Sequence, residues 1–280
     1  MPQSLQKKYT AAWRNFAATW LKIYPPSRPS LGNIMAFKKL MFEAIKNKNN
    51  VQVLLLGSTP ELRDLFAKYH QLKVTVCDIN MEMIIAMTNL MKRKTDNEIW
   101  IKASWTTAPL RQNYYDLVFG DFVTGNVPRR DLLQMYQHIN DLLKKDGYFI
   151  TRFFSYFDKK ALLDLDKVIM KMSQKKLTDK VVSDLWSFGV FCCGSQNKQV
   201  SADRLFARLK FLAKNDQKIK KLNDATLKII PRHKYWAYGY SGQEDEKLLK
   251  KYFVIEKYLP DTCHPVYRQL SRIYKLKRKQ

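Results

Sequence analysis

The pattern of hydrophobic positions changes character along the chain. Residues 4–24 carry apolar side chains at steps of three and four, which predicts an amphipathic helix that ends at Pro25-Pro26. A second helix is expected from a cap at Ser30 to about residue 46. From residue 51 onward, short apolar runs alternate with helical stretches. The chain therefore begins with helices and continues as an alternation of strands and helices.

This alternation indicates an α/β fold. Short apolar runs predict strands at 51–56, 73–77, 99–102, 116–119 and 148–154, and helical patterns between them predict helices at 60–69, 81–94 and 130–144. Such an order is typical of a doubly wound, mostly parallel sheet with helices on both faces. Beyond residue 154 we expect helices at 159–172 and 202–222 and a late strand at 253–258. Residues 186–193 are expected to form a strand or a buried lining segment.

Composition narrows the class of protein. The chain has 280 residues, of which 46% are hydrophobic, and this is enough apolar material to exclude disorder of the whole chain. No stretch approaches the roughly 18 consecutive apolar residues of a membrane-spanning helix, and no signal peptide is recognisable at the beginning. The four cysteines form neither a disulfide framework nor a metal-binding pair. We expect a cytoplasmic protein in a reducing compartment, without a structural metal.

The distribution of charge points to a polyanionic partner. The formal net charge is +25, with 50 lysines and arginines against 25 acidic residues. Residues 1–50, 51–150 and 151–280 carry net charges of +8, +1 and +16. A lysine-rich genome would load the middle segment as well, so a polyanionic partner such as RNA explains the segregation better. The number of subunits cannot be inferred from these patterns.

Two residues at the ends of neighbouring predicted strands suggest a nucleotide site. Gly57 follows the strand at 51–56, where it permits a tight turn, and Pro60 suits the first turn of the next helix. Asp78 ends the second strand, 21 residues after Gly57. A carboxylate in that place can accept hydrogen bonds from both ribose hydroxyls of a nucleotide-like cofactor.

These motifs resemble the class I S-adenosylmethionine-dependent methyltransferases over roughly residues 51–155. Gly57–Leu62 resembles motif I without its second and third glycines, residues 116–121 resemble motif IV, and residues 145–150 resemble the turn into strand five. The resemblance implies a seven-stranded Rossmann-like sheet, an enzyme and S-adenosylmethionine as its cofactor. The usual acid after strand three is missing. The implied cofactor residues are Gly57, Ser58, Thr59, Pro60, Asp78, Ile79, Ser104, Trp105, Gly120 and Asp121.

Competing reactions fit the motifs less well. A dinucleotide oxidoreductase needs glycines for the pyrophosphate, and Glu61 at the helix start would repel it. Residues 121–124 differ from the tetrad that methylates exocyclic base amines, and no Pro-Cys serves carbon-5 attack. A ribose 2′-O-methyltransferase would use a Lys-Asp-Lys-Glu tetrad, for which Lys38 or Lys39, Asp121 and Glu256 are available. Arg152 stands in the fourth place and cannot act as a base.

The candidate catalytic residues are Asp121, Arg152 and His233. Asp121 is expected beside the transferred methyl group. Arg152 either clamps an acidic acceptor or forms a structural bridge with Asp121. His233 and His264 are candidate bases, although such histidines are more often plain surface or packed residues. Between residues 155 and 250, bases mix with aromatic rings in a way that suits single-stranded nucleic acid, and the candidate substrate residues are Arg204, Arg208, Lys214, Tyr235 and Trp236.

Together these features predict four segments. Residues 1–50 form a helical cap, 51–155 the cofactor-binding core, 156–250 a basic and aromatic insertion for substrate recognition, and 251–280 the final strands and a basic tail. The expected function is methyl transfer to RNA or another polyanion. A small-molecule or peptide methyltransferase, or a non-catalytic nucleic-acid-binding module of this fold, are the alternatives.

Overall fold

The chain forms two compact units. The computed structural model describes residues 18–46, 48–155, 164–193, 200–230, 235–236, 242–263 and 267–279. Residues 31–158 and 239–280 form one unit, which we call the sheet unit, and residues 1–30 and 159–238 form the other, the helical unit. The sheet unit therefore includes the helix that follows Ser30, and the helical unit is built from two separate stretches of chain.

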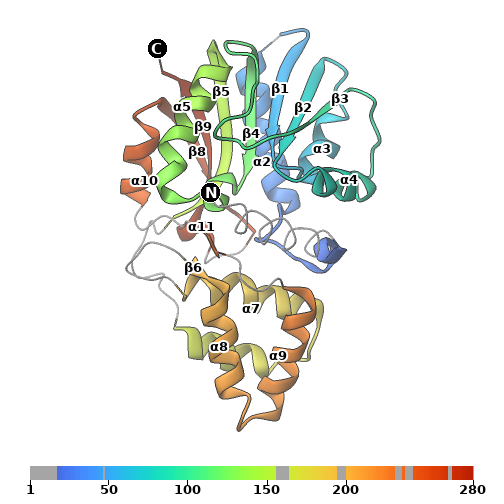
Figure 1. The fold of residues 1–280 in the computed structure, drawn as a ribbon, viewed down its shortest axis with the longest axis vertical. Coiled ribbons are helices and arrows are strands. Elements are labelled where there is room, and N and C mark those ends of the chain that lie inside the picture. Colours follow the sequence, from blue (N-terminus) through green and yellow to red (C-terminus); the bar gives the residue numbers. More distant parts are fainter. Residues whose placement is uncertain are drawn as a thin grey trace. The chain divides into compact units, whose positions relative to one another are not determined.

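A seven-stranded sheet organises the sheet unit (Figure 1). Its strand order is β3-β2-β1-β4-β5-β9-β8. The first five strands along the chain are parallel to one another, and β9 is antiparallel to both β5 and β8. The predicted doubly wound, mostly parallel sheet is confirmed. The strands are β1 (Val51–Leu56), β2 (Leu72–Asp78), β3 (Glu98–Lys102), β4 (Tyr115–Asp121), β5 (Leu143–Phe154), β8 (Phe253–Pro260) and β9 (Ser271–Arg278).

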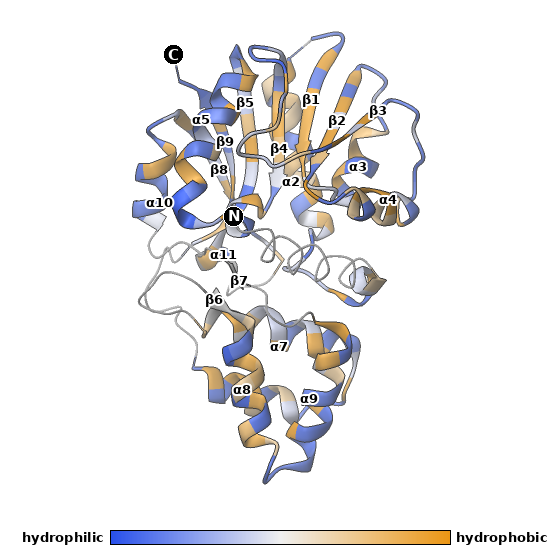
Figure 2. Cartoon of the chain, viewed as in Figure 1, coloured by the Kyte–Doolittle hydropathy of each residue, from blue (hydrophilic) through white to orange (hydrophobic). Residues whose placement is uncertain are grey.

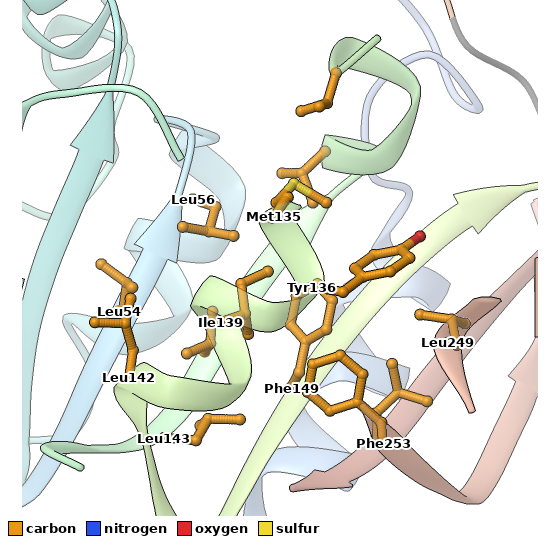
Figure 3. Packing of buried hydrophobic residues seen from close by; sticks show 14 of the residues in the cluster. Leu54, Leu56, Met135, Tyr136, Ile139, Leu142, Leu143, Phe149, Leu249 and Phe253 are labelled. Carbon is orange, nitrogen blue, oxygen red and sulfur yellow. The ribbon is translucent and has the colours of Figure 1, made fainter. Parts of the chain in front are cut away.

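Helices cover both faces of this sheet because the strands are apolar on both faces (Figure 2). One core joins Phe37 and Phe66 to Phe119 of β4, and the other joins Tyr136 to Phe253 (Figure 3). The helices and 3-10 turns of the unit are α2 (Leu31–Ile45), α3 (Pro60–Phe66), α4 (Met81–Asn89), η2 (Val123–Asn126), η3 (Arg129–Asp131), α5 (Leu132–Leu142), α10 (Gly242–Leu249) and α11 (Tyr267–Leu270).

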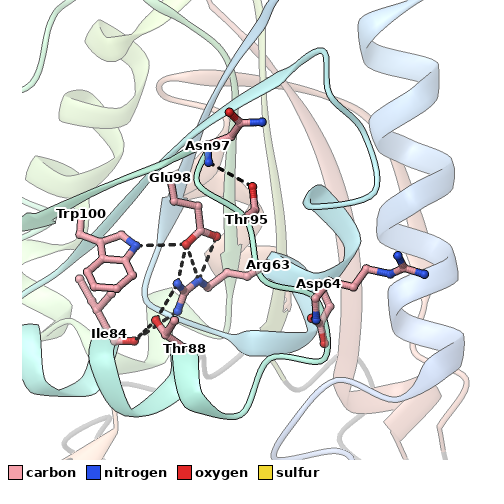
Figure 4. A network of polar contacts seen from close by, with 9 residues as sticks. Arg63, Asp64, Ile84, Thr88, Thr95, Asn97, Glu98 and Trp100 are labelled. Atoms are coloured by element: carbon pink, nitrogen blue, oxygen red, sulfur yellow. Dashed lines mark hydrogen bonds and ion pairs between the residues drawn. The ribbon is translucent and has the colours of Figure 1, made fainter.

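A buried ion pair fixes the β3 edge of the sheet (Figure 4). The Arg63 guanidinium from α3 is fully buried and lies 2.5 Å from the Glu98 carboxylate of β3. The same guanidinium donates to the Thr88 hydroxyl at 2.8 Å and to the Ile84 carbonyl at 3.2 Å, both on α4. The Trp100 indole donates to Glu98 at 3.1 Å. One arginine thus joins α3, α4 and the edge strand, and its charge is neutralised and hydrogen-bonded.

Helices make up most of the described part of the helical unit. Asp164, Thr178 and Asp216 cap three of them by accepting backbone N–H groups, and Ile169, Leu185, Leu205 and Leu222 belong to the apolar interior. The elements of the unit are η1 (Trp20–Lys22), α6 (Leu165–Ser173), α7 (Asp179–Phe191), β6 (Val200–Ser201), α8 (Ala202–Leu212), α9 (Gln217–Ile229) and β7 (Tyr235–Trp236). The helix expected at 4–24 lies mostly outside the described residues, and in its described end the structure has the 3-10 turn η1.

Two stretches of this unit differ from the sequence expectations. Of the two alternatives for residues 186–193, the strand is wrong, because most of these residues continue helix α7. Its apolar positions are buried almost all round, and a Cβ on Gly189 would lie 2.9 Å from Leu205, so the periodic signal of an amphipathic helix is weak. The single helix expected at 202–222 is two helices, since Asp216 caps a new one. None of the helices in the described part of the chain has the length and apolar character that a membrane crossing needs.

Candidate active site

The turn after β1 brings the predicted glycine and tryptophan together. Gly57 has a φ of +84°, a conformation that favours glycine, and its N–H donates to the Cys77 carbonyl at 2.8 Å. The Trp105 indole donates to the same carbonyl at 2.8 Å. A Cβ on Gly57 would lie 3.6 Å from the Trp105 ring. The ends of β1 and β2 and the loop after β3 therefore meet at one carbonyl group.

Asp78 lies at the end of β2, next to this turn. Its carboxylate accepts the Asn80 N–H at 2.9 Å and also hydrogen bonds from the Ser58 hydroxyl and the Ile79 backbone. Burial raises the pKa of Asp78 to about 6, although these hydrogen bonds act in the opposite direction. A carboxylate that is costly to ionise, beside an exposed apolar Ile79, is typical of a binding site rather than of a free strand end.

The other predicted cofactor residues lie at the same edge of the sheet. Gly120 pairs in register with Leu56 and Thr151, so β4 ends beside β1 and β5. A Cβ on Gly120 would lie 2.6 Å from Val123, so only glycine fits there without a shift of the following turn. All ten predicted residues lie at or just after the carboxyl ends of the first four strands: Gly57, Ser58, Thr59, Pro60, Asp78, Ile79, Ser104, Trp105, Gly120 and Asp121. Their roles in binding stay predictions.

Asp121 and Arg152 form a buried bidentate pair at this edge. The Arg152 Nε lies 2.6 Å from Asp121 Oδ1, and Nη2 lies 3.0 Å from Oδ2. The remaining terminal nitrogen, Nη1, donates to Asn33 at 2.9 Å and to Asp261 at 3.1 Å. Asn33 in turn donates to Asp261 at 3.0 Å. Of the two roles open to Arg152, the geometry favours the structural bridge.

The charges in this cluster do not balance. One guanidinium faces two carboxylates, and Arg152 is fully buried. Burial, assisted by Asp261, raises the pKa of Asp121, and Arg152 opposes that rise. Burial also acts to raise the pKa of Asp261, but Arg152 and Asn33 outweigh it and the pKa is lowered. Among the described residues, Arg152 thus faces two carboxylates, of which Asp261 is the more readily ionised.

The turn after β4 is held by the same arginine. Phe122 has a φ of +56°, and its N–H donates to the Arg152 carbonyl at 2.8 Å. The Arg152 guanidinium lies 3.9 Å from the centre of the Phe122 ring, which also stacks on Phe154 at 3.9 Å. A bulky residue in the left-handed region is strained, and here the contacts of its ring and backbone hold it.

Comparison with known proteins assigns this edge of the sheet to a domain family. Residues 56–147 match the methyltransferase domain family, and this stretch runs from the last residue of β1 to Gly147 of β5. The matched residues include the Gly57 turn, Asp78 and Asp121.

This match supports a class I S-adenosylmethionine-dependent methyltransferase. Solved structures at low identity resemble this methyltransferase in fold. The N-methyltransferase NodS of Bradyrhizobium japonicum, crystallised with S-adenosylhomocysteine, is 6% identical with a TM-score of 0.51, over 95% of this chain and 100% of that chain. A methyltransferase of Methanosarcina mazei is 13% identical with a TM-score of 0.53, over 85% and 96%. A protein of Rhodobacter sphaeroides described as an alcohol dehydrogenase is 13% identical with a TM-score of 0.60, over 97% and 99%. Likeness at this level shows the fold alone. No curated protein matches the chain.

The residues of this methyltransferase fit S-adenosylmethionine. Gly57 lets the backbone turn without a side chain, and Asp78 offers carboxylate oxygens to ribose hydroxyls. Ile79 is 39% exposed and offers an apolar surface next to that carboxylate. No phosphate has to be accommodated, so the acidic Glu61 in the first turn of α3 is compatible with this cofactor.

The predicted substrate residues of the methyltransferase lie in the helical unit, and two of them are engaged. Arg208 forms a bidentate pair with Asp166 at 2.7 and 2.5 Å, and Arg204 donates to the Cys193 carbonyl at 3.3 Å. Lys214 is exposed after α8. The backbones of Tyr235 and Trp236 form strand β7, which pairs with β6. His233 and His264 lie outside the described residues.

Sequence reasoning missed two members of the Arg152 cluster. Asn33 lies 119 residues before Arg152 and Asp261 lies 109 residues after it. Neither belongs to a motif, and Asn33 looks like an ordinary polar residue in a predicted amphipathic helix. The only signal in the sequence was indirect, since an arginine at the end of a buried strand requires buried acceptors.

Proposed function

We propose that this methyltransferase transfers a methyl group to RNA. The observation that carries the proposal is the segregation of charge, with +8 and +16 on either side of a nearly neutral core. The described residues 164–193 and 200–230 of the helical unit hold 13 lysines and arginines against seven acidic residues. Several of those acids cap helices or pair locally, so the unit offers positive charge to a polyanion.

S-adenosylmethionine supplies an electrophilic methyl group for an in-line displacement. We propose that Asp78, Gly57 and Ile79 bind the cofactor. Because both carboxylate oxygens of Asp121 accept from Arg152, the pair orients the turn after β4. Its contribution to methyl transfer is therefore to position the acceptor against the cofactor.

The proposal assigns recognition of RNA to the basic and aromatic insertion at 156–250. Phosphate contacts supply affinity without sequence preference, and rings stack on unpaired bases. The four cysteines are free thiols, which is consistent with the proposed reducing, cytoplasmic setting.

Radiolabelled methyl transfer tests the proposal. The purified protein is incubated with methyl-tritiated S-adenosylmethionine and, separately, with total RNA, a peptide mixture and a metabolite extract. We expect label in RNA, sensitive to ribonuclease, and none with Asp78→Ala, which removes the acceptor for the ribose hydroxyls. Label that appears only in peptides or metabolites contradicts the RNA assignment. Absence of label in all three fractions, with cofactor binding intact, favours the binding-module alternative.

A further inference from the structure

Helices α6, α8 and α9 share a seam that is marked by two polar contacts. At one end Asp166 of α6 pairs with Arg208 of α8 at 2.7 and 2.5 Å. At the other end Gln174, just after α6, accepts from the Lys218 ammonium of α9 at 3.1 Å. Asp166 and Gln174 are eight residues apart, which places them on one side of α6, about two turns from each other.

Two large apolar side chains are exposed along this seam. Met170 lies one turn after Asp166 and one turn before Gln174, and it is 45% exposed. Phe211 lies three residues after Arg208, is 57% exposed, and its ring centre lies 4.9 Å from the Arg208 guanidinium. Because Arg208 is tied to Asp166, it positions the Phe211 ring while the ring remains open to water.

Exposed lysines lie on the same helical segments as Met170 and Phe211, and on α9. Lys171 follows Met170, Lys175 follows Gln174, and the ammonium of Lys218 is fixed at Gln174. Lys214 is joined to Phe211 by a backbone hydrogen bond of 3.3 Å. These four lysines and the ring are called the Phe211 surface below.

Two acidic residues of these segments, Asp166 and Asp216, are already engaged in contacts. Asp166 accepts both hydrogen bonds from Arg208. Asp216 caps α9 by accepting the backbone N–H groups of Lys218 and Ile219 at 2.7 and 3.1 Å. Lys171 and Lys175 are four residues apart and both exposed, and such a like-charged pair is unfavourable unless an anion binds.

We propose that the Phe211 surface binds single-stranded RNA, with an unpaired base stacked on the ring and phosphates at the four ammonium groups. The inference rests on the proposed function, and it assigns recognition to different residues than the sequence pattern does. Arg208 acts by positioning Phe211, and Arg204 by holding the end of α7 through the Cys193 carbonyl. Lys214 is common to both assignments.

Binding of a fluorescein-labelled 20-nucleotide single-stranded RNA, followed by anisotropy across a potassium chloride series, tests this surface. Each lost phosphate contact on a single strand lowers the logarithmic salt slope by about 0.7. We expect Lys171→Gln/Lys175→Gln/Lys218→Gln to reduce the slope by about 2. The matched control, Lys92→Gln/Arg93→Gln/Lys94→Gln, removes three exposed charges from the loop before β3 and should leave the slope unchanged.

The ring is tested separately. Phe211→Leu should weaken binding about 10-fold at constant slope, because stacking is lost while the charges stay, and Phe211→Trp should restore the affinity. Equal salt slopes in the two triple variants, or an unchanged RNA affinity of Phe211→Leu, would show that RNA does not bind at the Phe211 surface.

Tritium transfer to RNA by the same proteins separates the two proposals. If the wild type methylates RNA while the surface variants bind RNA normally, the role of the Phe211 surface is refuted and RNA remains the acceptor. RNA that binds through this surface without being methylated shows that the surface stands and the proposed acceptor is wrong.

Discussion

Asp78→Asn should make the protein more stable while it weakens cofactor binding. In the folded protein, burial raises the pKa of this carboxyl from 3.8 to about 6. The native state thus holds the proton more tightly than the unfolded chain, so the free energy of unfolding falls as the pH rises from about 4 to about 6 and remains lower above that. A rise of about two pKa units corresponds to about 3 kcal/mol at neutral pH, since one unit is worth about 1.4 kcal/mol.

The asparagine variant avoids this cost because an amide does not ionise. Its oxygen can still accept from the Asn80 N–H, and its amide nitrogen can donate to the Ser58 hydroxyl. We expect the free energy of unfolding at pH 7.5 to rise by about 2–3 kcal/mol, and the two proteins to be equally stable near pH 4. Affinity for S-adenosylmethionine should fall by about 1.5–3 kcal/mol, because a hydrogen bond to a charged acceptor is lost.

Urea denaturation at pH 4 and 7.5 and titration calorimetry measure the two effects. Asp146→Asn is the matched control, because a hydrogen bond from Lys48 lowers the pKa of this exposed carboxyl and the same substitution should bring no gain in stability. Equal stability of Asp78→Asn and wild type at pH 7.5 refutes the electrostatic reasoning. An unchanged dissociation constant in the folded variant refutes the role of Asp78 in binding.

Three further substitutions test neighbouring contacts. Gly120→Ala should cost about 1–3 kcal/mol in urea denaturation, because its Cβ would lie 2.6 Å from Val123, and adding Val123→Ala should recover most of the loss; no recovery would place the strain elsewhere. Glu98→Ala should lower the free energy of unfolding by about 3–5 kcal/mol in the same assay, since Arg63 would stay buried without a counter-charge. A loss under about 1 kcal/mol would show that the Arg63 side chain moves out into water. Asp121→Asn should lower turnover much more than cofactor affinity, as steady-state kinetics and calorimetry would show; equal losses make the residue a plain binding group.

The strands of the sheet were predictable from the local sequence pattern where consecutive residues are apolar and buried. The run Val51–Leu56 is apolar at five of six positions and bounded by Asn50 and Gly57, and β1 has the predicted bounds. Helix α7 was not predictable in the same way, because Leu185, Trp186 and Val190 are all buried and an apolar run without a polar face fits a strand as well as a helix.

The site was predictable only for residues that lie at the carboxyl ends of predicted strands. Gly57 and Asp78 follow from chain order, since parallel strands bring their carboxyl ends together. The partners of Arg152 do not, because Asn33 and Asp261 reach it from more than 100 residues away in the sequence. A pairing of this kind depends on the packed tertiary structure, and no local spacing encodes it.

The position of β9 has a consequence for folding during synthesis on the ribosome. This strand, residues 271–278, inserts between β5 and β8 and pairs with both. Until it has been synthesised, β5 remains an unpaired edge, and the 120 or so residues between the two strands must be made first. The sheet is therefore completed late, after the helical unit has left the exit tunnel. Deleting this one strand should leave β5 as an exposed edge strand that is prone to aggregation.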